Sequence, residues 1–315
     1  MSINKSSLGF VFPGQGSQTV GMLADLADSY PLVQQTFEEA SESLGRDLWK
    51  IAQQGPSEEL NMTQNTQPSV LTAGVALWRV WQTQSDLRPN FMAGHSLGEY
   101  TALVCSNSIS FVDAVKLVEQ RATFMQQAVP EGEGAMAAVL GLDVDKLIAI
   151  CQHAAQGEIV SAVNFNAPGQ VVIAGNTAAV ERAIAEAKEH GAKRALPLPV
   201  SVPSHCELMR PASEKLLEVL SSVEVSTPDT MILHNTDVLS HQDPDDIKQA
   251  LAKQLYTPVR WTETIEKLGQ ANMRTVVECG PGKVLSGLNK RIDKSLNILS
   301  VADESAFTKT LEALS

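Results

Sequence analysis

A serine flanked by two glycines is the residue of this sequence best placed to act as a nucleophile. Ser96 is the centre of a Gly-x-Ser-x-Gly pattern at residues 94–98, after a short apolar run at 91–93 and before a helical stretch at 99–104. A sharp turn from strand to helix projects a serine hydroxyl outward, and flanking glycines avoid the clashes that Cβ atoms would cause. We therefore predict a nucleophile at Ser96, although the pattern alone also arises by chance.

A serine nucleophile needs a general base, and the chain has six histidines. We predict His205 as the base because it follows a predicted small domain, where the chain returns to the cleft between domains. The candidate acids Asp237, Asp243, Asp245 and Asp246 all lie after His205, whereas α/β-hydrolases place the acid between the serine and the histidine. A carbonyl oxygen could orient the imidazole instead. The other histidines are expected to be structural or exposed: His95 on the turn, His153 and His190 on polar helix faces, and His234 and His241 in a polar loop region.

Arg121 is a cation in an apolar setting. In a helix predicted over residues 111–128, its neighbours three and four positions away are all apolar: Leu117, Val118, Phe124 and Met125. A buried guanidinium needs a negatively charged partner or a path to water. Two readings stay open, an internal carboxylate or the carboxylate of a substrate held by a bidentate contact.

The turn at residues 13–18 follows a predicted strand and is rich in glycine. It lacks the Lys-Ser/Thr of a phosphate-binding P-loop, and Thr19 stands where a dinucleotide motif needs its third glycine. The turn does offer exposed amides and Gln15 as donors to an oxyanion, while a plain glycine turn is the alternative.

The elements that must hold these residues alternate between strand and helix, which predicts an α/β protein. Residues 135–198 read as strand (135–142), helix (144–155), strand (159–164), strand (171–174), helix (178–190) and strand (194–198), the βαββαβ order of a ferredoxin-like unit. We predict a small domain at residues 132–199 inserted into a large domain made of residues 1–131 and 200–315, with a substrate cleft between them.

Composition restricts the possible partners. The chain has 315 residues, 43% of them hydrophobic, and a formal net charge of −12. This charge disfavours nucleic acid and anionic membranes, and no apolar run approaches the roughly 20 residues of a membrane-spanning helix. Four scattered cysteines without metal-ligand spacing and an N-terminus unlike a leader favour a cytoplasmic protein with free thiols.

Further motifs occur in order along the chain. They are GQGSQ at 14–18, TQP at 66–68, GHSLGE at 94–99, Arg121, NFNAPGQ at 164–170, Ser204 with His205, Gln254, and VECGPG at 277–282. Together they resemble the malonyl-CoA:acyl carrier protein transacylases of bacterial fatty acid synthesis, from Phe10 to about Lys290. Several motifs in the right order are far more specific than one serine turn.

The resemblance implies a role for each matching residue. Ser96 would be acylated, His205 would activate it, and Arg121 would bind the free malonyl carboxylate. The amides of Gln15 and Leu97 would form the oxyanion hole. The main-chain oxygen of Gln254 would orient His205, and contacts with CoA or the carrier are expected at Asn164, Gln170, Lys193 and Arg194.

The resemblance also implies an α/β-hydrolase-like large domain with a ferredoxin-like small one. Malonyl-CoA would be the substrate and holo acyl carrier protein the acceptor, with no cofactor and no metal, in an enzyme expected to be a monomer. Ser204 departs from the family, because many malonyl-selective relatives carry Phe before the catalytic histidine. Two rival functions stay open, a serine esterase or thioesterase and a noncatalytic module that binds a carrier protein.

Overall fold

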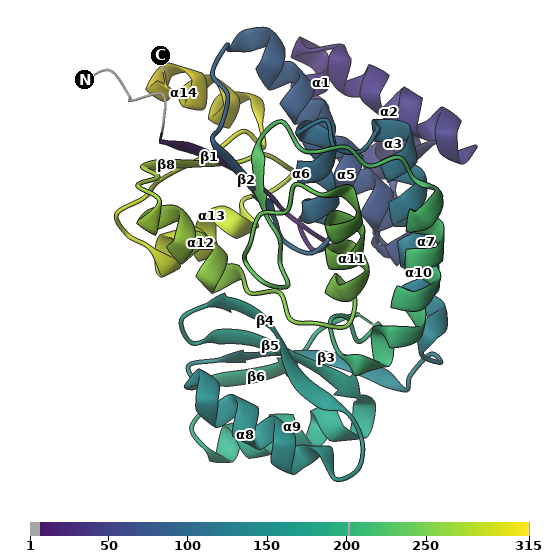
Figure 1. Cartoon of the computed structure of the whole chain (residues 1–315), viewed down its shortest axis with the longest axis vertical. Coiled ribbons are helices and arrows are strands. Elements are labelled where there is room, and N and C mark those ends of the chain that lie inside the picture. The colour runs from purple at the N-terminus through teal and green to yellow at the C-terminus, as the bar shows by residue number, and fades with distance from the viewer. Residues whose placement is uncertain (1–6, 201, 315) are drawn as a thin grey trace.

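The computed structural model describes residues 7–200 and 202–314. It contains two sheets in separate parts of the molecule, one parallel and one antiparallel, with helices packed around them (Figure 1). The chain is therefore a mixed α/β protein, as the alternation of elements predicts.

The parallel sheet has five strands in the order β7-β2-β1-β8-β9, which draws on both ends of the chain. These strands are β7 (Met231–Leu233), β2 (Phe91–Gly94), β1 (Leu8–Phe12), β8 (Thr275–Glu278) and β9 (Asn297–Ser300). All five residues of β1 are buried, because helices cover both faces of a parallel sheet. The carboxyl ends of β1 and β2 meet at one edge of this sheet, where ligands commonly bind in α/β folds.

The antiparallel sheet has four strands in the order β4-β5-β3-β6. Its elements follow the chain as β3 (Gly134–Leu140), α8 (Val144–Ala155), β4 (Val160–Ala167), β5 (Gln170–Asn176), α9 (Thr177–Glu189) and β6 (Arg194–Pro197). The order is the predicted βαββαβ. Helices α8 and α9 lie together on the face of the sheet that points away from the rest of the molecule (Figure 1).

The remaining helices surround the parallel sheet. They are α1 (Ala24–Ser29), α2 (Leu32–Leu44), α3 (Leu48–Gln54), α4 (Ser57–Asn61), α5 (Thr63–Gln84), α6 (Gly98–Cys105), α7 (Phe111–Ala128), α10 (Arg210–Ser222), α11 (Pro244–Gln254), α12 (Trp261–Gln270), α13 (Val284–Ile292) and α14 (Glu304–Leu314). Within residues 7–200 and 202–314, none of the helices is both long and apolar enough to cross a bilayer.

Main-chain hydrogen bonds join the antiparallel sheet to the segment before α12. The amide of Phe165 donates to the carbonyl of Val259 at 3.0 Å, and the amide of Val259 donates to the carbonyl of Val163 at 2.8 Å. These contacts hold β4 beside the elbow at residues 94–98, since His95 also bonds to Asn166 of β4 at 2.8 Å.

The predicted bounds agree with the observed ones at two helices and differ slightly elsewhere. Helices α7 and α8 have the predicted limits, and the ends of the other elements of the small domain differ from the prediction by at most three residues. The largest difference is β4, which continues past residue 164 to Ala167, because pairing with β5 across the turn extends both strands. Element ends depend on such neighbours more than on local pattern.

Candidate active site

The turn between β2 and α6 presents Ser96. Its φ of 53° lies in the left-handed region, the kind of backbone strain that collects at functional sites. A Cβ at Gly94 would lie 1.8 Å from the carbonyl carbon of Gly98, and a Cβ at Gly98 would lie 2.0 Å from the carbonyl oxygen of Phe12. Both glycines are therefore required for the turn to close against β1.

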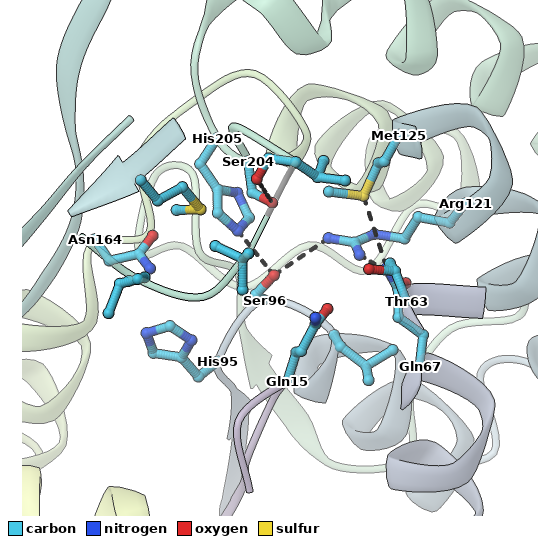
Figure 2. A pocket seen from close by; sticks show the side chains of 15 residues that line it. Gln15, Thr63, Gln67, His95, Ser96, Arg121, Met125, Asn164, Ser204 and His205 are labelled. Carbon is cyan, nitrogen blue, oxygen red and sulfur yellow. Dashed lines mark hydrogen bonds between the residues drawn. The ribbon is translucent and has the colours of Figure 1, made fainter. Parts of the chain in front are cut away.

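His205 lies beside the serine although 109 positions separate them in the chain. Its Nε2 is 2.8 Å from Ser96 Oγ (Figure 2). Its Nδ1 is 2.8 Å from the main-chain oxygen of Gln254. A carbonyl oxygen only accepts, so Nδ1 carries the hydrogen and Nε2 is left to accept the serine proton. The backbone carbonyl thus occupies the place that a carboxylate takes in a Ser-His-Asp triad.

The environment of His205 keeps its ring neutral. Burial lowers the pKa of His205 to about 3, with the positive charge of Arg121 acting in the same direction. The side chain is 3% exposed. A neutral imidazole is the form that acts as a general base.

The acylation rate of Ser96 should therefore change little between about pH 8 and about pH 5, because the base is protonated only well below this range. An unperturbed imidazole, with a pKa of about 6.5, would lose about 30-fold in its basic form over the same interval. Rapid-quench measurement of acyl-enzyme formation across this range checks the expectation. An acid limb with a midpoint near 6.5 would contradict it.

Arg121 reaches the serine from α7. The helix begins at a capping residue, Ser110, whose hydroxyl accepts from the amide of Asp113 at 3.1 Å. The guanidinium donates from Nη1 to Gln67 Oε1 at 2.8 Å, and from Nη2 to Gln254 Oε1 at 2.9 Å and Ser96 Oγ at 3.2 Å. These partners are neutral.

Arg121 is also 1% exposed, and burial lowers the pKa of its guanidinium. Its Nε has no hydrogen-bond partner among the described residues. The described residues form no ion pair with Arg121, so the first of the two readings above, an internal carboxylate in direct contact, is not observed. A carboxylate brought by a substrate would supply the missing negative charge.

Two main-chain amides near Ser96 donate no hydrogen bond within the described part of the chain, those of Gln15 and Leu97. Both residues line the same cavity as Ser96. The Ser96 amide differs, since it donates to Asn235 Oδ1 at 2.7 Å. A Cβ at Gly14 would lie 2.5 Å from the carbonyl oxygen of His95, so a glycine is needed there to bring the Gln15 turn close to the elbow.

Ser96 lines the smaller of two neighbouring cavities. The smaller, of about 130 Å³, holds Ser96, His205 and Arg121 and is lined on its far side by Met125 and Ser204 (Figure 2). The larger, of about 450 Å³, lies between the turn at residues 13–18, strands of the antiparallel sheet and α13. His95 and Asn164 line both, so the two cavities are adjacent.

The residues expected to contact CoA or the carrier divide into two groups. Asn164 lines both cavities, and Gln170 lines the larger one, where its Oε1 accepts from Arg291 at 2.6 Å. Lys193 and Arg194 are exposed at the start of β6 and line neither cavity. The structure places Asn164 in the cavity of Ser96 and Gln170 in the adjacent one, and it leaves Lys193 and Arg194 on the surface.

Comparison with known proteins supplies the family. A model described as "Acyl transferase domain" matches residues 9–303. The chain belongs to the acyl transferase family.

Named relatives of this acyl transferase cover nearly its whole length. It is 58% identical to the malonyl CoA-acyl carrier protein transacylase of Haemophilus influenzae, over 96% of this chain and 98% of that one. It is 57% identical to the protein of the same name from Escherichia coli strain K12, with the same coverage.

Solved structures agree with the sequence matches. The acyl carrier protein S-malonyltransferase of Vibrio cholerae superposes with a TM-score of 0.95 at 56% identity, covering 97% of this chain and all of that one. A malonyl-transacylase in complex with its type II PKS acyl-carrier protein superposes with a TM-score of 0.97 at 55% identity, covering 98% and 100%.

The acyl transferase also contains buried polar residues that sequence reasoning missed. Glu99 and His234 are both 0% exposed, and their Oε1 and Nδ1 atoms lie 2.7 Å apart. His234 lies in the loop after β7, in the predicted polar region, but this part of the loop is buried against α6. A signal was present in the sequence, because Glu99 opens an otherwise apolar helix, much as Arg121 interrupts an apolar stripe.

No group of three or more His, Cys, Asp or Glu side chains among the residues described is arranged to hold a metal ion. The cysteines, Cys105, Cys151, Cys206 and Cys279, are buried free thiols. Burial raises the pKa of Cys206, the neighbour of the histidine, to about 11, so its thiol is a poor nucleophile at neutral pH.

Proposed function

We propose that this acyl transferase moves the malonyl group of malonyl-CoA to the phosphopantetheine thiol of an acyl carrier protein, through a malonyl ester on Ser96. The product would be the extender unit of fatty acid synthesis. One observation carries the choice of a carboxylated acyl group: the buried cation of Arg121 has neutral partners and lies 3.2 Å from the serine oxygen. The names of the relatives support the same substrate and acceptor.

The first half of the reaction follows from the positions of these groups. Ser96 Oγ attacks the thioester carbonyl while His205 Nε2 takes its proton, and the amides of Gln15 and Leu97 stabilise the oxyanion. The carbon–sulfur bond then breaks, and the CoA sulfur takes the proton from the imidazolium. Arg121 holds the malonyl carboxylate throughout, so the thioester is presented to the serine in one orientation.

The second half repeats these steps with a different nucleophile. The carrier thiol gives its proton to His205 and attacks the malonyl ester, and Ser96 is released when its oxygen takes the proton back. Asn164 is a candidate contact for the incoming arm, because its buried Oδ1 has no hydrogen-bond partner among the described residues. Lys193 and Arg194 stay candidates for docking an acidic carrier.

Mass measurement of the intact protein after brief exposure to malonyl-CoA tests the proposal. We expect one malonyl group on Ser96, and its transfer to holo carrier protein when this is added. Rapid release of free CoA without an acceptor would favour a hydrolase instead. Absence of labelling would favour a noncatalytic module that binds a carrier.

The finer description of the architecture is part of the proposal. The βαββαβ order supports a ferredoxin-like small domain at residues 132–199, and the parallel sheet with its serine elbow supports a hydrolase-like large domain. From the sequence, we also propose that the protein is a cytoplasmic monomer. It would need no cofactor beyond its substrate and would bind neither nucleic acid nor membrane.

Selection against an α-methyl group should depend on residue 204. Ser204 lines the small cavity with Met125, and a phenylalanine there would occupy space beside the malonyl α-carbon. Ser204→Phe is expected to raise the preference for malonyl-CoA over methylmalonyl-CoA about tenfold, the usual discrimination for one methyl group in a pocket. Competition between the two thioesters for Ser96, read by intact mass, measures it.

Ser204→Ala is the control, because it removes the hydroxyl without adding volume. Its preference should match that of the unmodified protein. A phenylalanine variant with unchanged preference would show that the cavity wall at this position does not face the α-carbon.

A further inference from the structure

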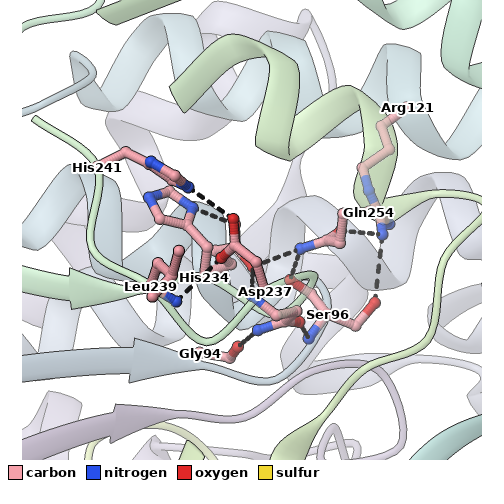
Figure 3. A network of polar contacts seen from close by, with 10 residues as sticks. Gly94, Ser96, Arg121, His234, Asp237, Leu239, His241 and Gln254 are labelled. Carbon is pink, nitrogen blue, oxygen red and sulfur yellow. Dashed lines mark hydrogen bonds and ion pairs between the residues drawn. The ribbon is translucent and has the colours of Figure 1, made fainter. Parts of the chain in front are cut away.

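The side chain of Gln254 connects the active site to a buried acid behind it. Its Oε1 accepts from Arg121 at 2.9 Å, and its Nε2 donates to the main-chain oxygen of Ser96 and to Glu99 Oε2, both at 3.0 Å (Figure 3). Its main-chain oxygen contacts His205. One fully buried residue at the end of α11 therefore contacts the nucleophile, the base and the cation.

Glu99 fixes which way this amide points. Its Oε2 accepts from Gln254 Nε2 and from the amide of Asn235 at 2.9 Å, while its Oε1 lies 2.7 Å from His234 Nδ1. Oε2 thus accepts from two donors, as a carboxylate oxygen can. A flipped Gln254 amide would set its oxygen against Glu99 and its NH2 group against Arg121, so the carboxylate permits only the observed orientation.

Glu99 also supplies a negative charge that none of the direct hydrogen-bond partners of Arg121 provides. A buried cation is costly unless an opposite charge is near. The carboxylate lies one amide away from the guanidinium, and this spacing compensates the charge without occupying the face of Arg121 that points to Ser96. A direct ion pair would place the acid where a substrate carboxylate must bind.

We propose that Glu99 is a positioning residue for the transfer reaction. Through the side-chain amide of Gln254, it holds in place Arg121 and the main-chain carbonyl that orients His205. Its charge also balances the buried cation. This inference rests on the proposed function. Glu99 contacts none of the reacting atoms, so its effect would be indirect.

Glu99→Gln tests the proposal because it keeps the shape of the side chain and removes the charge. We expect kcat to fall about tenfold for both malonyl-CoA and acetyl-CoA, since His205 serves both. KM for malonyl-CoA should not rise, because Arg121 keeps its bond to Gln67 and its less compensated charge still attracts the carboxylate. Rates are normalised to the fraction of Ser96 that becomes acylated, which removes the effect of unfolded protein. Glu278→Gln is the matched control and should keep its normalised kcat. Glu278 is equally buried, but it accepts hydrogen bonds from the main-chain amides of Leu285 and Ser286, away from this network.

A double-mutant cycle with Arg121→Met tests the charge balance separately. We expect Glu99→Gln to lower the Tm by about 4 °C in the unmodified protein, and by less than half of that when Arg121 is absent. Equal Tm shifts in the two backgrounds, or an unchanged normalised kcat, would overturn the proposal. A purely structural role would give equal shifts.

A second variant covers the case in which Glu99→Gln does not fold. Gln254→Met keeps the main-chain carbonyl and cuts the link between Glu99 and Arg121, so it should show the same fall in kcat, and a wild-type kcat would overturn the proposal. The unmodified protein distinguishes this failure from failure of the proposed function. If it forms no malonyl-Ser96, the function itself is wrong, whereas malonylation with unaffected variants removes only the role of Glu99.

Discussion

Replacing Ser96 with alanine is expected to abolish malonyl transfer, with a loss of at least about 10⁴-fold in kcat. No other nucleophile lies at this turn, and the covalent step has no substitute once the hydroxyl is gone. Alanine tolerates the φ of 53° about as well as serine does, so the turn should keep its shape. The absence of any malonyl adduct in intact mass spectra, with unchanged thermal unfolding, checks this result.

Ser69→Ala is the matched control for this variant. Ser69 is a buried serine of α5 whose hydroxyl has no hydrogen-bond partner among the described residues. Its loss should therefore leave both stability and transfer nearly unchanged. Malonyl transfer at a normal rate by Ser96→Ala would mean that the acyl group is carried elsewhere.

Replacing Arg121 with alanine is expected to reverse the acyl preference. Charge-assisted contacts to a buried carboxylate contribute about 3 kcal/mol, which corresponds to about 10²-fold in kcat/KM for malonyl-CoA. Acetyl-CoA has no carboxylate for Arg121 to bind, so its use should be retained or improved. Parallel measurement of kcat/KM for the two thioesters gives the ratio.

Arg79→Ala is the corresponding control. Arg79 lies over the ring of Phe111 at 4.7 Å, as Arg121 lies over Tyr100 at 5.4 Å, but its charge is paired with Glu39 away from the site. Its loss should lower stability without changing the ratio of malonyl to acetyl use. An unchanged ratio in Arg121→Ala would refute the carboxylate contact.

Local pattern was sufficient to predict the elements and the main reactive residues. The glycines around Ser96 predict a sharp turn, because a residue with a Cβ would clash with the neighbouring backbone at either position. The limits of α7 and α8 follow from helical periodicity between capping residues. Arg121 could be singled out because a charge within an apolar stripe needs an explanation.

Other parts of the site depend on contacts that no local pattern contains. The strand order of the parallel sheet and the meeting of Glu99 with His234, 135 positions later, are examples. The orientation of His205 could be anticipated only through family resemblance, because any residue type offers a main-chain carbonyl. Lys193 and Arg194 were candidates by charge alone, and charge does not specify distance from a cavity.

The sequence by itself determined that this chain is an α/β protein with a serine turn, a candidate histidine base and a cation that needs a negative partner. Those properties follow from residue type and short-range spacing. Only the tertiary structure decided that the cation is left with neutral partners, that a backbone carbonyl orients the base, and that a buried acid stands behind both. Such contacts join residues far apart in the chain, and they exist only once the packing of helices and sheets has set their distances.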